Sequence, residues 1–255
     1  MAKAFEHRHP NFINAFYGDG PAGAGKTFIY EKITHYVRPT GRIVLIVAVS
    51  GIAALLLPGG RTAHSRFRLP VPLPLEGARA NIAANSNTAK LLRETALLIW
   101  DEAPNAPRAA FGAVNRCLQD VLQDLPNRDK RQPFGGLPVL LGGDFRQIPP
   151  VLRRVDINEF PAHTLKACDW WVLDRHVKRY KLVRNKRAEA DPEYAAMILQ
   201  IGDGEFDQDR RRATTTEPGA TDTPQAAISL PDKFLAKQHD DLAELIDWTY
   251  GDWME

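Results

Sequence analysis

The stretch Gly20–Thr27, GPAGAGKT, decides the fold of this 255-residue chain. It has the pattern G-x-x-x-x-G-K-[ST], in which small residues let the backbone curl so that successive N–H groups face a phosphate. The apolar run at residues 12–17 predicts a buried strand before the loop, and residues 28–33 after it favour a helix. Strand, loop and helix in this order are the setting that the motif requires. The sequence therefore predicts a nucleoside triphosphate site.

Each position of the loop has an expected task. Lys26 should reach the β- and γ-phosphates of ATP, and the Thr27 hydroxyl should bind Mg²⁺. The dipole of the following helix adds positive potential at the loop. The residues that we expect to hold the nucleotide are Gly20, Pro21, Ala22, Gly23, Ala24, Gly25, Lys26 and Thr27. The loop alone names no reaction, and a chance glycine-rich turn is the alternative.

Strand and helix patterns alternate along the chain. The expected strands are short, unalternating apolar runs at residues 42–49, 96–100 and 137–142. The expected helices cover residues 27–37, 50–57, 88–94 and 108–125. Unalternating runs are typical of parallel strands that are covered on both faces. We therefore predict an α/β fold, a doubly wound parallel sheet of the P-loop NTPase type.

Composition sets broader limits. Hydrophobic residues make up 44% of the chain, which is enough for a core. Cys117 and Cys168 lie far apart in sequence, which suggests packing residues rather than a metal site or a disulfide. No apolar stretch has the length of a membrane span, so we expect an intracellular protein without a membrane partner. Seven of the thirteen residues from Arg175 to Arg187 are Lys or Arg, which indicates either a nucleic-acid contact or a solvated face.

The run Leu97–Glu102, LLIWDE, is the second chemical motif. An apolar strand that ends in two acidic residues presents carboxylates at the carboxyl edge of the sheet, where open α/β sheets bind ligands. In an NTPase, Asp101 would bind Mg²⁺ through water and Glu102 would polarise the attacking water. An acidic helix cap is the alternative.

A third strand leads into Gly142-Gly143-Asp144-Phe145-Arg146-Gln147. The two glycines would let the backbone approach the nucleotide closely, and Gln147 would contact the γ-phosphate or the attacking water. The alternative for Asp144 and Arg146 is a local ion pair. Two further stretches fit no helix or central strand: the proline-rich residues 69–80, and the polar residues 208–225, which suggest a flexible loop.

Taken together, these blocks resemble the petite-integration-frequency (PIF-type) DNA helicases, a superfamily 1 group related to RecD. The matching blocks are GDGPAGAGKTFIY (18–30), SGIAALLLPGGRTAHSRF (50–67), LLIWDEAP (97–104), PFGGLPVLLGGDFRQIPPV (133–151), KLVRNKR (181–187) and ILQIGDGE (198–205). Several blocks in the right order are far more specific than any one of them. The resemblance covers nearly all of residues 12–205.

The resemblance implies roles for further residues. Gln147 would sense the γ-phosphate, and Arg187 would be an arginine finger contributed by a second RecA-like domain. The residues implied to line a single-stranded DNA track are Ser50, Gly51, Thr62, His64 and Ser65. For His64 a structural role is the alternative. The proline-rich segment lies where the family inserts a small wedge domain, so residues 69–88 are either a strand-splitting element or a surface loop.

The resemblance also implies a domain plan and a function. We expect a RecA-like ATPase domain over residues 1–176 and a partial second RecA-like domain over residues 177–255, with a flexible loop at 206–226. The family's later motifs have no counterpart before Glu255, so the chain looks truncated at its C-terminus, and no glutamine upstream of the loop selects adenine.

The expected function is ATP- and Mg²⁺-dependent, 5′-to-3′ unwinding of DNA by movement along a single strand, in repair, recombination or telomere maintenance. The expected location is nuclear or mitochondrial. The alternatives are a remnant that binds ATP or DNA without unwinding, and a P-loop ATPase with another task.

Overall fold

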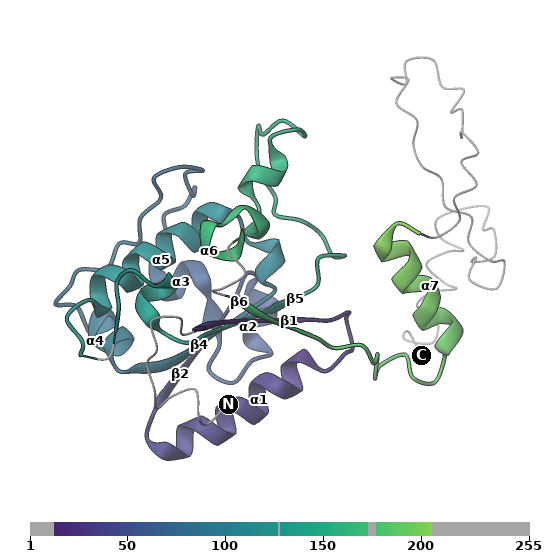
Figure 1. The fold of residues 1–255 in the computed structure, drawn as a ribbon, viewed down its shortest axis with the longest axis horizontal. Helices are drawn as coiled ribbons and strands as arrows, with labels where there is room; N and C mark the ends of the chain where they lie inside the picture. Colours follow the sequence, from purple (N-terminus) through teal and green to yellow (C-terminus); the bar gives the residue numbers. More distant parts are fainter. Residues whose placement is uncertain (1–12, 127, 173–176, 206–255) are drawn as a thin grey trace, which may run out of the picture. The chain divides into compact units, whose positions relative to one another are not determined.

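The computed structural model describes residues 13–126, 128–172 and 177–205 (Figure 1). The chain divides into two compact units, Met1–Gly202 and Asp203–Glu255. Nearly all of the second unit, including the loop expected at 206–226, lies outside the described residues. The account below therefore concerns the first unit.

A six-stranded parallel sheet forms the centre of this unit. The strands are β1 (Ala15–Asp19), β2 (Ile43–Ala48), β3 (Arg61–Thr62), β4 (Thr95–Asp101), β5 (Val139–Gly143) and β6 (Val177–Lys181). Their order across the sheet is β3-β2-β4-β5-β1-β6. From β1 the chain crosses to the edge at β3 and then returns across the sheet to the opposite edge at β6, with every pair of neighbouring strands parallel, which confirms the doubly wound parallel architecture.

Helices cover both faces of the sheet, and Figure 1 shows α1 and α5 on opposite sides of it. The helices are α1 (Lys26–Val37), α2 (Gly51–Leu55), α3 (Ala63–Phe67), α4 (Asn87–Arg93), α5 (Arg108–Leu122), α6 (Asp169–Val172) and α7 (Pro192–Asp203). Short 3-10 turns lie at Arg38–Thr40, Ala103–Asn105, Pro133–Gly136, Phe160–His163 and Leu165–Ala167. All four helices that the sequence predicted are present, although α2 and α5 end two or three residues early.

The apolar runs of the strands supply two separate cores. Along β2, the side chains of Val44 and Ile46 pack in the cluster that contains residues of α1 and α2. Leu45 and Val47 pack in the other cluster, with residues of α4, α5 and α6. A strand that is buried on both faces cannot alternate with polar residues. This burial explains why the predicted strands carry unbroken apolar sequences.

The segment between α3 and α4 has neither helix nor strand over residues 69–80, as its prolines predicted. Two of its residues, Leu69 and Ala78, are buried and attach it to the larger core cluster. The carbonyl of Ala78 also accepts a hydrogen bond from the guanidinium of Arg116 on α5. The segment is therefore fixed to the unit at two buried points.

The expected domain boundary after residue 176 differs from the structure. β6, residues 177–181, pairs in parallel with β1 over its whole length and is an edge strand of the same sheet. Only Val177 of this strand is buried, so its basic sequence has no apolar run that would reveal a strand. The whole basic segment, residues 175–187, therefore belongs to the first compact unit, which extends to Gly202.

Candidate functional site

The loops after five strands bring the sequence-predicted residues to the carboxyl edge of the sheet. The phosphate loop follows β1, Ser50 follows β2, Glu102 follows β4, Gln147 follows β5 and Arg187 follows β6. Backbone hydrogen bonds join these loops: the N–H of Gly20 donates to the carbonyl of Gly143 at 3.2 Å, and the N–H of Leu182 donates to Asp19 at 2.7 Å. One edge therefore carries all the predicted chemistry.

The phosphate loop between β1 and α1 has the conformation that an anion requires. Gly23 and Gly25 adopt positive φ angles of 83° and 90°, which only glycine adopts readily. α1 begins at Lys26, and no side chain caps its first turn. A Cβ atom at Gly25 would meet nothing within 4 Å. An uncapped helix N-terminus behind an open loop of small residues fits a phosphate group.

Lys26 lies over this loop. Its Nζ donates to the carbonyls of Gly20 at 2.6 Å and Pro21 at 3.1 Å. Burial lowers the pKa of Lys26, an effect that the charges of Asp101, Asp144 and Asp19 oppose. A partly desolvated ammonium beside three carboxylates suits a nucleotide that arrives with a divalent cation, because the cation balances the acidic side chains.

Asp101, at the end of β4, is held by a residue that the sequence patterns did not single out. The hydroxyl of Tyr30, on α1, donates a hydrogen bond of 3.0 Å to Oδ1 of Asp101. Burial raises the pKa of Asp101, whereas the bond from Tyr30 and the charge of Lys26 lower it. A carboxylate that is fixed in orientation beside the lysine is a suitable indirect ligand for Mg²⁺.

The two glycines of β5 leave room for side chains from α1 and from the turn after β4. A Cβ atom at Gly142 would collide with the hydroxyl of Tyr30, and one at Gly143 would collide with the ring of Pro104. From the sequence, we expected these glycines to let the backbone approach the nucleotide closely. In the structure the space beside them is filled by the chain's own side chains, which support Asp101 and the turn after Glu102.

Glu102 adopts a left-handed conformation, with φ 53° and ψ 32°, and starts the turn Ala103–Asn105. Its Oε2 accepts a hydrogen bond of 3.3 Å from the hydroxyl of Ser50. A non-glycine residue in this region is uncommon and costs on the order of 1 kcal/mol or more. This backbone conformation sets the direction in which the Glu102 side chain projects.

The loop after β5 contains the local ion pair that the sequence offered as an alternative. Nη1 of Arg146 lies 3.1 Å from Oδ1 of Asp144, and the backbone N–H of Arg146 donates to the same oxygen at 3.1 Å. Gln147 follows and is exposed. The pair gives Asp144 and Arg146 a structural role, and the part of Gln147 in catalysis stays a prediction.

The loop after β6 lies against the phosphate loop. The N–H of Lys186 donates to the carbonyl of Gly23 at 3.0 Å. Oδ1 of Asn185 accepts from the N–H groups of Arg187 and Ala188, each at 3.1 Å. The charge of Arg187 also contributes to the lowered pKa of Lys26. Arg187 was expected to come from a second domain, but it reaches the phosphate loop from within the first unit.

The residues expected along a DNA track follow β2 and β3, with structural roles for two of them. The hydroxyl of Ser50 caps α2 by accepting from the N–H of Ala53 at 3.1 Å, and Thr62 caps α3 by accepting from Ser65 at 3.2 Å. Gly51 is the first residue of α2, and burial lowers the pKa of His64 on α3. Nothing in these contacts tests DNA binding, which stays a prediction.

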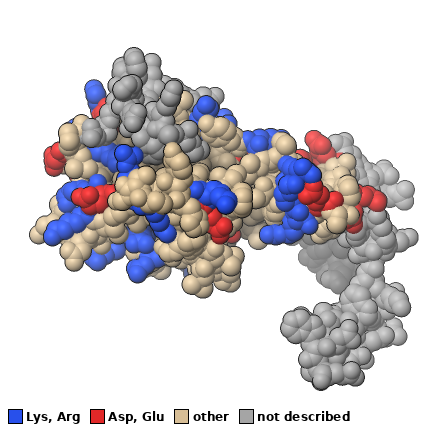
Figure 2. All heavy atoms as spheres, turned by 90° about the horizontal axis from the view of Figure 1, so that it is seen from below, with Lys and Arg blue, Asp and Glu red and all other residues tan. Residues whose placement is uncertain are grey.

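Positive charge gathers next to these residues. Arg61 is exposed, and after burial its charge is the second cause that lowers the pKa of Arg66. Arg68 is exposed as well. On the face seen in Figure 2, Lys and Arg side chains are dispersed, with Asp and Glu between them.

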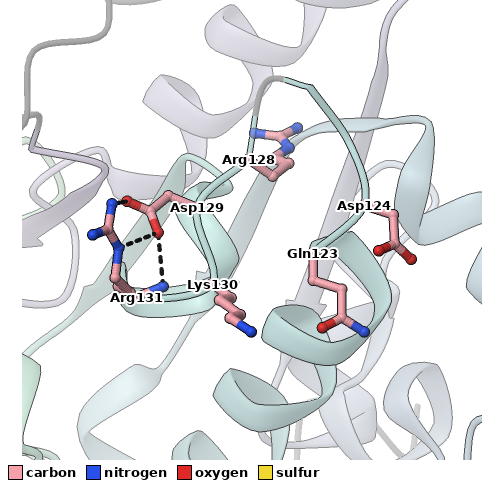
Figure 3. Close-up of a pocket in the computed structure, with 6 residues that line it drawn as sticks. All are labelled: Gln123, Asp124, Arg128, Asp129, Lys130 and Arg131. Atoms are coloured by element: carbon pink, nitrogen blue, oxygen red, sulfur yellow. Dashed lines mark hydrogen bonds and ion pairs between the residues drawn. The ribbon is translucent and has the colours of Figure 1, made fainter.

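A hollow of about 270 Å³ lies elsewhere on the unit (Figure 3). Its lining residues are Gln123, Asp124, Arg128, Asp129, Lys130 and Arg131. Arg128 donates to the carbonyl of Thr95, where β4 begins, at 2.9 Å, and to that of Gly136, ahead of β5, at 3.0 Å. These contacts place the hollow at the amino edge of the sheet, away from the candidate site. Arg131 and Asp129 form an ion pair within it.

The two cysteines pack in the larger core cluster, as the sequence suggested. Cys117 and Cys168 are free and buried, and burial raises the pKa of each thiol, to about 11 and about 12. Among the residues that the structure describes, no group of three His, Cys, Asp or Glu side chains could hold a metal ion. In the same part of the chain, no helix has the length and apolar character needed to cross a membrane.

Comparison with known proteins finds relatives of a large part of the chain. The chain is 36% identical to the ATP-dependent DNA helicase Pif1 of Psychrobacter over 140 residues, which cover 54% of this chain and 20% of the relative. It is 28% identical to the helicase PIF1 of Candida albicans over 214 residues, covering 78% of this chain and 22% of the relative. The chain thus spans about a fifth of the length of these relatives.

Solved structures of Pif1 helicases have a similar fold. Pif1 from Bacteroides, bound to single-stranded DNA, superposes with a TM-score of 0.63 at 25% identity, over 77% of this chain and 44% of that one. Pif1 from Candida albicans superposes with a TM-score of 0.62 at 24% identity, over 77% of this chain and 42% of that one, and shows the fold alone. The sequence model described as PIF1-like helicase matches residues 2–212. The chain therefore belongs to the PIF1-like helicase family.

Proposed function

We propose that this chain is the nucleotide-binding part of an ATP-dependent DNA helicase, which couples ATP hydrolysis to 5′-to-3′ movement along single-stranded DNA. The observation that supports this most strongly is the grouping of Lys26, Asp101 and Glu102 at one sheet edge, beside an uncapped phosphate loop. Membership of a helicase family gives the site its reaction class. We expect the work to be intracellular maintenance of nuclear or mitochondrial DNA.

The residues present fit ATP and Mg²⁺. The backbone N–H groups of the loop would bind the β-phosphate, with Lys26 across the β- and γ-phosphates. Thr27, exposed in the first turn of α1, and Asp101 would hold Mg²⁺. ATP with its bound Mg²⁺ supplies the phosphoryl group that passes to water. Asp101 keeps its orientation through the hydrogen bond from Tyr30.

Three further side chains would act on the water and the developing charge. Glu102 would accept a proton from the attacking water, and exposed Gln147 would orient that water or the γ-phosphate. Arg187 would stabilise negative charge in the transition state from its position beside the phosphate loop. The turn at Asn185 supports this role, because it fixes the backbone at Arg187 by two hydrogen bonds.

The DNA strand would lie along α2 and α3, in contact with Ser50, Gly51, Thr62, His64 and Ser65. Hydroxyl groups, exposed backbone and the neighbouring arginines suit contacts with phosphates that do not depend on sequence. The side chains of Ile52 and Leu55 on α2, and of Leu56 directly after it, are exposed and suit unstacked bases. The proline-rich residues 69–88 are the expected strand-splitting element. The Bacteroides relative was solved with single-stranded DNA bound.

The test is ATP turnover by the 255-residue chain, with and without a single-stranded oligonucleotide. We expect turnover that rises with DNA, in a salt-dependent manner, because binding through phosphate contacts weakens as salt increases. Turnover that does not respond to any oligonucleotide at low salt would remove the DNA strand from the proposal. If the chain shows no ATP turnover at all, the proposed ATPase activity is wrong.

A second candidate is a chain that binds nucleotide and DNA without unwinding. It is favoured by the single sheet that the described residues form, since strand separation in the proposal needs two lobes around the nucleotide. A strand-displacement assay on a tailed duplex separates the candidates. ATP-dependent unwinding by this chain alone would exclude the second one.

A further inference from the structure

Ser50 joins the two halves of the candidate site. Its hydroxyl oxygen accepts the N–H of Ala53 at 3.1 Å, which caps α2, and its hydroxyl hydrogen donates to Oε2 of Glu102 at 3.3 Å. The pairing of β2 with β4 sets this contact, because Ala48 lies opposite Asp101 at the ends of the two strands. The loops that follow the strands therefore leave the sheet side by side.

The other partner is equally fixed. Glu102 is held in a left-handed conformation by the turn that follows, in which its carbonyl accepts the N–H of Asn105 at 2.9 Å. Its carboxylate is thus anchored by the backbone on one side and by the Ser50 hydroxyl on the other. A carboxylate that accepts this bond offers one lone-pair site fewer to a water at the phosphate loop, and its Oε2 is held toward Ser50.

Ser50 is also open to a ligand. It is exposed and is the N-cap of α2. The side chains of Ile52 and Leu55 on this helix, and of Leu56 directly after it, are 78%, 87% and 73% exposed. A single strand that stacks bases on these side chains would bring its phosphates to the start of α2. A serine hydroxyl has one hydrogen to donate. The same hydroxyl therefore cannot donate to Glu102 and to a DNA phosphate at the same time.

We propose that Ser50 is a positioning residue that holds Glu102 in the DNA-free chain and releases it when its hydroxyl donates to single-stranded DNA. The hydroxyl keeps its proton throughout, and only the acceptor of its hydrogen bond changes. The released carboxylate then takes up the attacking water. This inference rests on the proposed function, and it supplies a direct link between DNA binding and hydrolysis.

The experiment compares Ser50→Gly, Ser50→Ala and Ser50→Thr by ATP turnover with and without an oligo-dT strand. Glycine caps a helix almost as well as serine, whereas alanine does not, so Ser50→Gly removes the bond to Glu102 and largely spares α2. Threonine keeps both the cap and the donor. We expect DNA-free turnover to rise several-fold in Ser50→Gly and Ser50→Ala, stimulation by DNA to fall accordingly, and Ser50→Thr to behave as the wild type.

A double variant shows whether the rise in DNA-free turnover depends on Glu102. Adding Glu102→Gln to Ser50→Gly should return turnover to the residual rate of Glu102→Gln alone. If DNA stimulates ATP turnover equally in the wild type and in Ser50→Gly, this inference is overturned and the proposed function stands. A wild-type chain without any turnover would overturn both. Melting temperatures of all variants show whether a loss of rate comes from loss of the fold.

Discussion

The hydroxyl of Tyr30 on α1 donates a hydrogen bond of 3.0 Å to Oδ1 of Asp101 at the end of β4. Tyr30 is buried, and the bond joins residues 71 positions apart in the sequence. The helix that starts at the phosphate loop thus fixes the carboxylate proposed to bind Mg²⁺. Tyr30 therefore connects the helix of the phosphate loop to the carboxylate of the proposed Mg²⁺ site.

Replacement of Tyr30 by phenylalanine removes this bond and keeps the ring. We expect the Mg²⁺ concentration for half-maximal ATP turnover to rise about fivefold, because a hydrogen bond of about 1 kcal/mol no longer orients Asp101. A Mg²⁺ titration measures the change. Tyr36→Phe, at an exposed position on the same helix, is the matched control. An unchanged Mg²⁺ requirement in Tyr30→Phe would show that the bond does not serve the metal site.

Gly142→Ala tests the space that Tyr30 occupies. The new methyl group would collide with the Tyr30 hydroxyl, so we expect a loss of about 1–3 kcal/mol in the free energy of unfolding. Denaturant unfolding measures it. Gly18→Ala, in the neighbouring part of β1, meets only Leu141 at an ordinary 3.9 Å and is the control. Adding Tyr30→Phe should restore part of the loss. Strict additivity of the two changes would contradict the contact.

Lys26→Ala removes the cation over the phosphate loop. Affinity for a fluorescent ATP analogue should fall roughly tenfold to a hundredfold, about 1–3 kcal/mol, while Lys32→Ala on the same helix should not change it. Burial lowers the pKa of Lys26, so its ammonium loses the proton at a lower pH than an exposed lysine does. Wild-type affinity should therefore weaken as the pH rises through this lowered pKa. Equal affinity of Lys26→Ala and wild type would remove Lys26 from the site.

Asn185→Ala removes the acceptor that fixes the backbone of Arg187. We expect the maximal rate of ATP turnover to fall several-fold toward that of Arg187→Ala, with little change in nucleotide affinity, since Arg187 is proposed to act on the transition state. Asn185→Asp keeps an acceptor oxygen and should retain most of the rate. If Asn185→Ala instead weakens nucleotide binding and leaves the maximal rate unchanged, the turn serves the phosphate loop and not Arg187.

The sequence predicted the parts of this site that depend on local pattern. The phosphate loop is recognised from its own small residues, Lys26 and Thr27. Asp101 and Glu102 follow the unbroken apolar run at residues 96–100, and such runs mark strands that are buried on both faces. β6 was missed because an edge strand with one buried residue, Val177, has no such run. Local patterns also could not reveal the contacts that orient the site. Tyr30 meets Asp101, and Ser50 meets Glu102, only once the sheet has formed.

The central claim is that the carboxyl-edge cluster hydrolyses ATP through Glu102. The most direct measurement is ATP turnover by Glu102→Gln, with affinity for a fluorescent ATP analogue measured on the same preparation. Glu94→Gln is the matched control, because Glu94 is an exposed residue just before β4, whereas Glu102 lies just after it. We predict that Glu102→Gln binds the analogue with Mg²⁺ as the wild type does and that its turnover falls at least about a hundredfold. Turnover that survives this substitution would contradict the account.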